Sequence, residues 1–113
     1  MSEVEELMAQ IVKKLPMTKE YNQYKDVLNR VKAKPDLYHR IGEFRRKSME
    51  IRMSGNGNTI QAMNELQKEF QDLQNNALSA DFFVAEHQYC RMIQELENQF
   101  LEGAQIETDF LEK

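Results

Sequence analysis

The chain has 113 residues, of which 41% are hydrophobic and 30% charged, and its formal net charge is −4. This length allows a single domain, residues 1–113, and the hydrophobic content excludes a wholly disordered chain. No apolar run reaches the roughly 20 residues of a membrane span. The lone cysteine, Cys90, excludes an intramolecular disulfide and suits a reducing compartment. Because the N-terminus is acidic where a signal peptide is basic, we expect a cytoplasmic protein.

Helical periodicity predicts an all-α fold of about five helices joined by short connections. The first apolar stripe, residues 4–15, stops at Pro16, because the residue before a proline avoids helical torsions. Thr18 is a suitable N-terminal cap for the second helix. Pro35 ends that helix and suits the first turn of a third.

The third and fourth predicted helices form a hairpin around the one evident loop, residues 54–58. Gly55 can adopt the left-handed torsions that end a helix. The third helix has an apolar seam with a period near 3.5, which suits side-by-side packing, at Leu37, Ile41, Phe44, Ser48 and Ile51. Gly42 neighbours this seam, and we expect it to lie at a close helix crossing. The fourth helix runs from Ile60 to about Ala77.

The last helix is expected to run from Ala80 to Leu111, with Ser79 as its cap. It would be roughly 48 Å long, whereas a compact chain of this size is only roughly 35 Å across. The helix would therefore overhang its own globule and need a second chain to cover its apolar stripe. We expect a homodimer or higher oligomer, with an interface at Phe82, Tyr89, Ile93, Leu96 and Phe100.

Basic residues crowd the middle of the chain, while acidic residues dominate its last third. The third helix carries a candidate partner or RNA face at Arg40, Arg45, Arg46, Lys47 and Arg52. Such a helix could contact RNA phosphates, dock an acidic helix, or simply be solvated. The sequence pI of about 5.2 and the lack of an RNA-binding signature argue against nucleic acid.

Two small groups of residues are candidates for chemistry. Asp36 and His39 have a spacing that can hold a metal, but a di-iron bundle would need a second such pair and further carboxylates. Cys90 lies near His87 without any oxyanion-hole motif, and we expect it to be a small buried residue. The sequence therefore predicts no catalytic residue, no metal ligand and no cofactor site, and we expect the protein not to be an enzyme.

The order of these features resembles the YlbF/YmcA family, also described as control of competence regulator ComK. The resemblance spans roughly Val4 to Leu111. It is carried by Glu20-Tyr21-x-x-Tyr24, Lys34-Pro35-Asp36, Ile41-x-x-Phe44, the Gly–Asn loop and the long final helix rich in Phe, Glu and Tyr.

The resemblance implies an all-helical fold that associates through its long helices. It also implies a non-enzymatic regulator, working with other regulatory proteins in complexes that affect competence, sporulation and biofilm formation. Such complexes act partly with a membrane-anchored endoribonuclease on messenger RNA. Some family members bind iron–sulfur clusters through additional cysteines near the C-terminus. This chain has only Cys90, so no cluster ligand is carried over.

Overall fold

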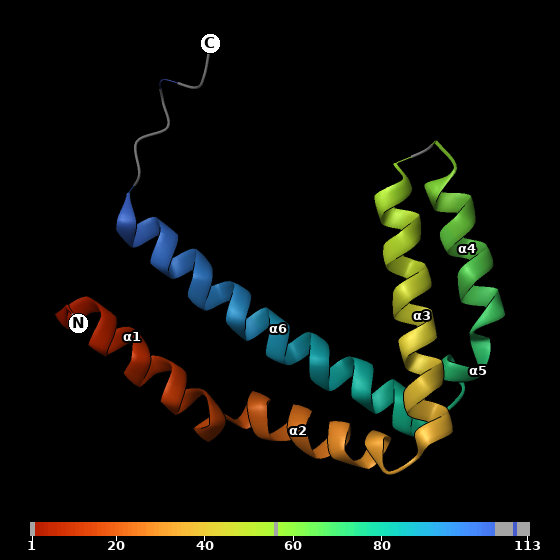
Figure 1. Ribbon diagram of the computed structural model, residues 1–113, viewed down its shortest axis with the longest axis horizontal. Helices are drawn as coiled ribbons and strands as arrows, with labels where there is room; N and C mark the ends of the chain where they lie inside the picture. Colours follow the sequence, from red (N-terminus) through yellow and green to blue (C-terminus); the bar gives the residue numbers. More distant parts are fainter. Residues whose placement is uncertain (1, 56, 106–109, 111–113) are drawn as a thin grey trace.

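The computed structural model describes residues 2–55, 57–105 and 110, and in that part of the chain there are helices and turns but no strand (Figure 1). The elements are α1 (Glu3–Lys14), the 3-10 turn η1 (Leu15–Met17), α2 (Lys19–Lys32), α3 (Pro35–Ser54), α4 (Thr59–Glu69), α5 (Gln71–Gln74) and α6 (Ala77–Ala104). The all-α prediction and the long C-terminal helix are therefore confirmed.

The helices form an open, flat arrangement with principal extents of 47 × 43 × 20 Å. Figure 1 shows α2 antiparallel to the first half of α6, and α1 alongside its second half. The α3–α4 hairpin stands away from this layer at the opposite end of the molecule from the N-terminus. At about 1.5 Å per residue, the 28 residues of α6 span about 42 Å. The second half of α6 thus lies beside α1 in a flat, extended fold, and not beyond a compact globule as expected from the sequence.

The hydrophobic core lies where α2, α3, α4, α5 and the first turns of α6 meet. Phe70 is its most central aromatic residue, 1% exposed, and the ring of Phe44 meets it edge-on with ring centroids 5.4 Å apart. The other buried apolar members of this cluster are Val31, Ile41, Leu66, Leu73 and Phe82. The core therefore fixes one end of α6 and leaves its other end outside.

Local sequence chemistry sets three helix boundaries as predicted. The Thr18 hydroxyl accepts a hydrogen bond from the Tyr21 amide at 3.2 Å and caps α2. Pro35 occupies the first turn of α3, and Gly55 ends that helix with a left-handed φ of 63°.

The start of α6 differs from the prediction, because Asn76 and not Ser79 is its cap. The Asn76 side chain accepts a hydrogen bond from the Ser79 amide at 3.0 Å. Ser79 is completely buried, and its hydroxyl donates to the backbone carbonyls of Leu73 and Asn76. Its hydroxyl thus joins α5 to α6 from inside the first turn.

The end of α6 also differs from the prediction. The helix ends at Ala104, where Gln105 adopts a left-handed φ of 47°. The remainder of the predicted helix, including Leu111, lies outside the described residues except for Phe110.

The predicted fourth helix is divided into α4 and α5. Phe70 leaves the helical torsions, with φ −107° and ψ 27°, and buries its ring in the core. The break leaves the Glu69 carbonyl with an Arg40 guanidinium donor at 3.0 Å. Carbonyl groups at the end of a helix have no donor within the helix, so a break of this kind requires another polar partner for them. The fold therefore has six α-helices in the described residues, one more than expected.

Candidate protein-interaction site

The apolar stripe of α6 is covered by its own chain along the first half of the helix only. Phe82 is 3% exposed and belongs to the core, so the prediction that it lies at an interface with a second chain is wrong. Tyr89 is half-buried between Tyr24 and Tyr21, with ring centroids 5.4 and 5.6 Å away. Because α2 provides these contacts, the apolar stripe of α6 is buried only along α2. The burial ends near Tyr89, where the N-terminal end of α2 lies.

Beyond Tyr89 the stripe opens to solvent. Ile93 is half-buried, Leu96 is 41% exposed and Phe100 is 56% exposed. Leu101 beside them is also exposed. Of the five predicted interface residues, the structure therefore leaves Ile93, Leu96 and Phe100 together on one surface.

The opposite wall is α1, an isolated amphipathic helix with no buried residue. Ser2 caps it by accepting a hydrogen bond from the Glu5 amide at 3.2 Å. Its apolar side chains are nevertheless exposed, and they are Val4, Leu7, Met8, Ile11 and Val12. The interface prediction missed this wall, although the spacing of four, three and four in Val4, Met8, Ile11 and Leu15 indicates a helix seam.

Between these walls lies an open cleft of about 890 Å³, which we call the α1–α6 cleft. Figure 1 shows α1 lying alongside the second half of α6. Its lining residues are Val4, Met8, Ile11, Val12 and Leu15 from α1, and Ile93, Leu96, Glu97, Gln99, Phe100, Gly103 and Ala104 from α6. Two apolar seams with coiled-coil spacing thus face one another across unfilled space.

The charges around the α1–α6 cleft are mainly acidic. Glu97 is the one charged residue that lines it, and Glu102 lies on the same exposed part of α6. The first turn of α1 adds Glu3, Glu5 and Glu6, whereas Lys13 and Lys14 lie in its last turn. The cleft is therefore apolar inside, acidic at its rim and basic at one end of α1.

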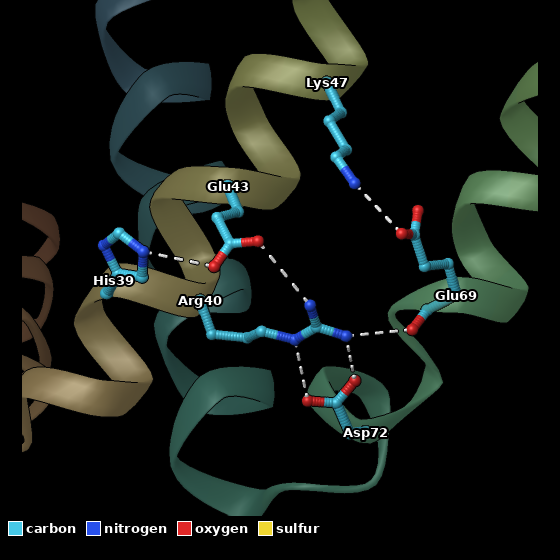
Figure 2. A network of polar contacts seen from close by, with 6 residues as sticks. All are labelled: His39, Arg40, Glu43, Lys47, Glu69 and Asp72. Carbon is cyan, nitrogen blue, oxygen red and sulfur yellow. Dashed lines mark hydrogen bonds and ion pairs between the residues drawn. The ribbon is translucent and has the colours of Figure 1, made fainter.

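The basic residues of α3 do not form one free surface. Figure 2 shows Arg40 held between α3 and the α4–α5 break, with its guanidinium donating to both Asp72 carboxylate oxygens at 3.1 and 3.2 Å. Hydrogen bonding from Arg40 lowers the pKa of Asp72, and the same bond raises the pKa of Arg40. Lys47 pairs with Glu69 at 3.0 Å. Arg40 and Lys47 thus hold the hairpin together.

Of the remaining basic residues of the predicted RNA or partner face, one is engaged within the fold and two are exposed. Arg45 forms an ion pair with Glu86 of α6 and lies over the ring of Phe82 at 5.3 Å. Arg46 and Arg52 are exposed, and neither has an ion pair within the described part of the chain. Three of the five residues are therefore engaged within the fold.

The fold does not bring the candidate metal-binding and thiol residues together into a site. His39 lies 3.2 Å from Glu43, one turn along α3. Cys90 is exposed, so the prediction of a buried cysteine is wrong, although its neighbour in the chain, Tyr89, is half-buried. No three His, Cys, Asp or Glu side chains converge anywhere in residues 2–55 and 57–105. Among these residues, no helix combines the length and hydropathy that crossing a bilayer requires.

Comparison with known proteins gives one informative match. The model of the family described as control of competence regulator ComK, YlbF/YmcA, matches residues 4–103, which include both walls of the α1–α6 cleft. The comparisons with curated proteins and with solved structures found no match.

Proposed function

The chain belongs to the YlbF/YmcA family, a family for control of a competence regulator, and we propose that it is a non-enzymatic, cytoplasmic regulatory adaptor that works by helix-mediated contact with other proteins. The observation that supports this proposal best is the α1–α6 cleft, with two unpaired apolar seams facing each other. The cytoplasmic assignment is supported by the exposed, unpaired Cys90, which suits a reducing compartment.

The cleft calls for a partner because of the energetics of α1. A 12-residue helix is marginal in water on its own, since nucleation is costly and only packing offsets it. α1 buries no residue in its own chain, although five of its apolar side chains lie on one stripe. A protein chain in the cleft would cover α1 and the distal half of α6 at once.

We propose that a second copy of this chain occupies the cleft. Seams with spacings of four and three pack side by side in helical bundles, so two α1–α6 pairs could complete a four-helix arrangement. α1 is acidic in its first turn and basic in its last, through Lys13 and Lys14. A two-fold axis that sets the two α1 helices antiparallel would place unlike charges together.

Sedimentation velocity on purified protein at tens of micromolar tests this proposal. We expect a dimer for the wild type and a monomer for the double variant Leu96→Ser, Phe100→Ser, because both changes place hydroxyls in the cleft. The matched control is Ile60→Ser on the α3–α4 hairpin, where the side chain is 79% exposed and lies outside the cleft. A monomeric wild type, or equal dissociation by the control, would overturn the proposal.

A further inference from the structure

A second hollow of about 470 Å³ lies between α2 and α3. We call it the α2–α3 hollow. Its apolar surface comes from Leu28, Val31 and Ile41, with Phe82 of α6 contributing to the lining, and the phenol rings of Tyr24 and Tyr38 add to it. The hollow thus offers apolar and aromatic contacts at the surface of a very polar chain.

The charged residues that line this hollow are mostly basic. Lys32 and Arg46 are exposed and have no ion pair among the described residues. Glu43 is the one acidic lining residue, and it is already paired with His39 and Arg40. A protein of net charge −4 therefore keeps a positively charged hollow, with two cations that form no ion pair within the described part of the chain.

Gly42 lines this hollow in the interior of α3, where glycine costs about 1 kcal/mol relative to alanine. Apart from its chain neighbours and the nearby backbone of its own helix, no heavy atom of the described residues lies within 4 Å of the position that its Cβ would occupy, so no close helix crossing there explains the glycine. The crossing expected from the sequence is therefore absent. A bare stretch of helix beside these two cations is instead accessible to another polypeptide chain.

We propose that the α2–α3 hollow binds residues 105–113 of a second copy of this chain. That segment alternates apolar Ile106, Phe110 and Leu111 with acidic Glu107, Asp109 and Glu112. Phe110 is 76% exposed, so its ring is available for a partner. The segment supplies negative charge for the basic residues of the hollow and apolar side chains for its apolar lining, which is the complementarity that directs a peptide to a site.

The geometry of α6 assigns the segment to a second copy and not to its own. Phe82, in the lining of the hollow, and Ala104, the last residue of α6, are about 33 Å apart along the helix. Residues 105–113 span at most about 32 Å when fully extended. They could therefore only just reach the hollow of their own chain, and no residue would remain to bind in it. The inference thus rests on the self-association proposed above.

Charge also separates this site from the α1–α6 cleft. The cleft is lined by Glu97 and begins beside the acidic first turn of α1, so it repels an acidic segment. The hollow attracts it through Lys32 and Arg46. The apolar cleft and the basic hollow therefore suit different parts of a second copy.

Fluorescence anisotropy with a labelled synthetic peptide of residues 104–113 tests the proposal on the full chain. We expect saturable binding that weakens as salt is raised, because part of the attraction is between charges. Arg46→Glu should weaken binding by at least about tenfold through like-charge repulsion. Arg52→Glu is the matched control, since Arg52 is also exposed on α3 but does not line the hollow, and it should leave affinity within about twofold.

Gly42→Leu is a second variant that fills the hollow without weakening the helix. Leucine is a far better helix former than glycine, and the position has open space, so the melting temperature should not fall. Peptide affinity should fall by at least about tenfold. Lost binding in a variant that remains as stable as the wild type cannot be attributed to unfolding.

Three results would overturn the proposal. The first is no binding of the peptide to the wild type at low salt. The second is equal loss from Arg46→Glu and Arg52→Glu, which would indicate a diffuse cationic surface of the kind that nucleic acid contacts. The third is loss from the cleft variant Leu96→Ser, Phe100→Ser but not from Arg46→Glu, which would place the segment in the α1–α6 cleft.

The same reagents distinguish this inference from the proposed function. The cleft double variant should be monomeric by sedimentation and still bind the peptide. A wild type that binds the peptide and forms a dimer that the cleft substitutions do not dissociate would refute the proposed function alone. A wild type that dimerises through the cleft but does not bind the peptide would refute the inference alone.

Discussion

Tyr89 of α6 stacks on Tyr24 of α2, with ring centroids 5.4 Å apart and ring planes 14° apart. The edge of Tyr21 meets the same Tyr89 ring at 5.6 Å. Beyond this aromatic group the stripe of α6 becomes increasingly exposed, from the half-buried Ile93 to Phe100, which is 56% exposed. Burial within the aromatic group raises the pKa of the Tyr24 hydroxyl. The covered and open halves of the long helix meet here.

Removing the Tyr89 ring should destabilise the fold, because it deletes a stacked and an edge contact together. We expect Tyr89→Ala to lower the free energy of unfolding by about 2 kcal/mol. Tyr38→Ala is the control, since that ring is half exposed and forms no ring pair in the described residues. Urea unfolding of both variants measures the difference, and equal losses would contradict this account of the α2–α6 contact.

Two glycines in or next to α3 should respond to alanine with opposite sign. Gly42→Ala should stabilise the protein by about 0.5–1 kcal/mol, because the helix gains a better former in open space. Gly55→Ala should destabilise it by about 1 kcal/mol, because Gly55 has a φ of 63° that alanine adopts with strain. Thermal unfolding of the two variants gives the signs, and a destabilising Gly42→Ala would reveal a contact that this fold does not have.

Two substitutions distinguish the roles of Asn76 and Ser79 in the first turn of α6. Asn76→Ala removes the side chain that accepts from the Ser79 amide and should cost about 1 kcal/mol. Ser79→Ala removes a buried hydroxyl whose carbonyl partners on Leu73 and Asn76 lose a donor, and it should cost about 1–2 kcal/mol. Denaturant titration of each variant would show the losses; an unaffected Asn76→Ala would contradict its role as the cap.

The Arg40–Asp72 pair should make stability depend on pH in the acidic range. The hydrogen bond from Arg40 holds the pKa of Asp72 below its ordinary value of 3.8. The folded state thus binds a proton less readily than the unfolded state, so the stabilisation is present above pH 3.8 and is lost as pH falls through the lower folded value.

Asp72→Asn removes this contribution and tests its sign. We expect a lower melting temperature than the wild type at pH 7, with the gap closing as the pH falls below 3.8. The effect should be small, since Asp72 is largely exposed and water screens the pair. A gap that widens on acidification would mean that the pair does not stabilise the fold.

Local chemistry predicted much of this fold, because helix boundaries depend on nearby residues. Thr18, Pro35 and Gly55 act at the places where their side chains or torsions require them to act. The first turn of α6 was harder, since Asn76 and Ser79 are both good caps three residues apart. Only the burial of Ser79 against α5, a tertiary contact, decides between them.

The interaction site was predictable only in part, because residues of the same type on one stripe of a helix can be buried in the core or exposed to solvent. Phe82 and Phe100 have the same side chain and helical phase, yet one is in the core and the other is 56% exposed. Their difference depends on where α2 begins alongside α6, which cannot be read from the local sequence pattern. The basic residues of α3 pose the same difficulty, since Arg40 and Arg46 differ only in what the fold places opposite them.

Hydrogen–deuterium exchange of the α1 amides at several protein concentrations tests the central claim most directly. α1 buries nothing within its own chain, so a monomer should exchange these amides nearly as fast as an unfolded peptide. If a second copy fills the α1–α6 cleft, protection of residues 3–14 should rise with concentration and disappear in the Leu96→Ser, Phe100→Ser variant. Protection that is independent of concentration and of these substitutions, or absent throughout, would contradict it.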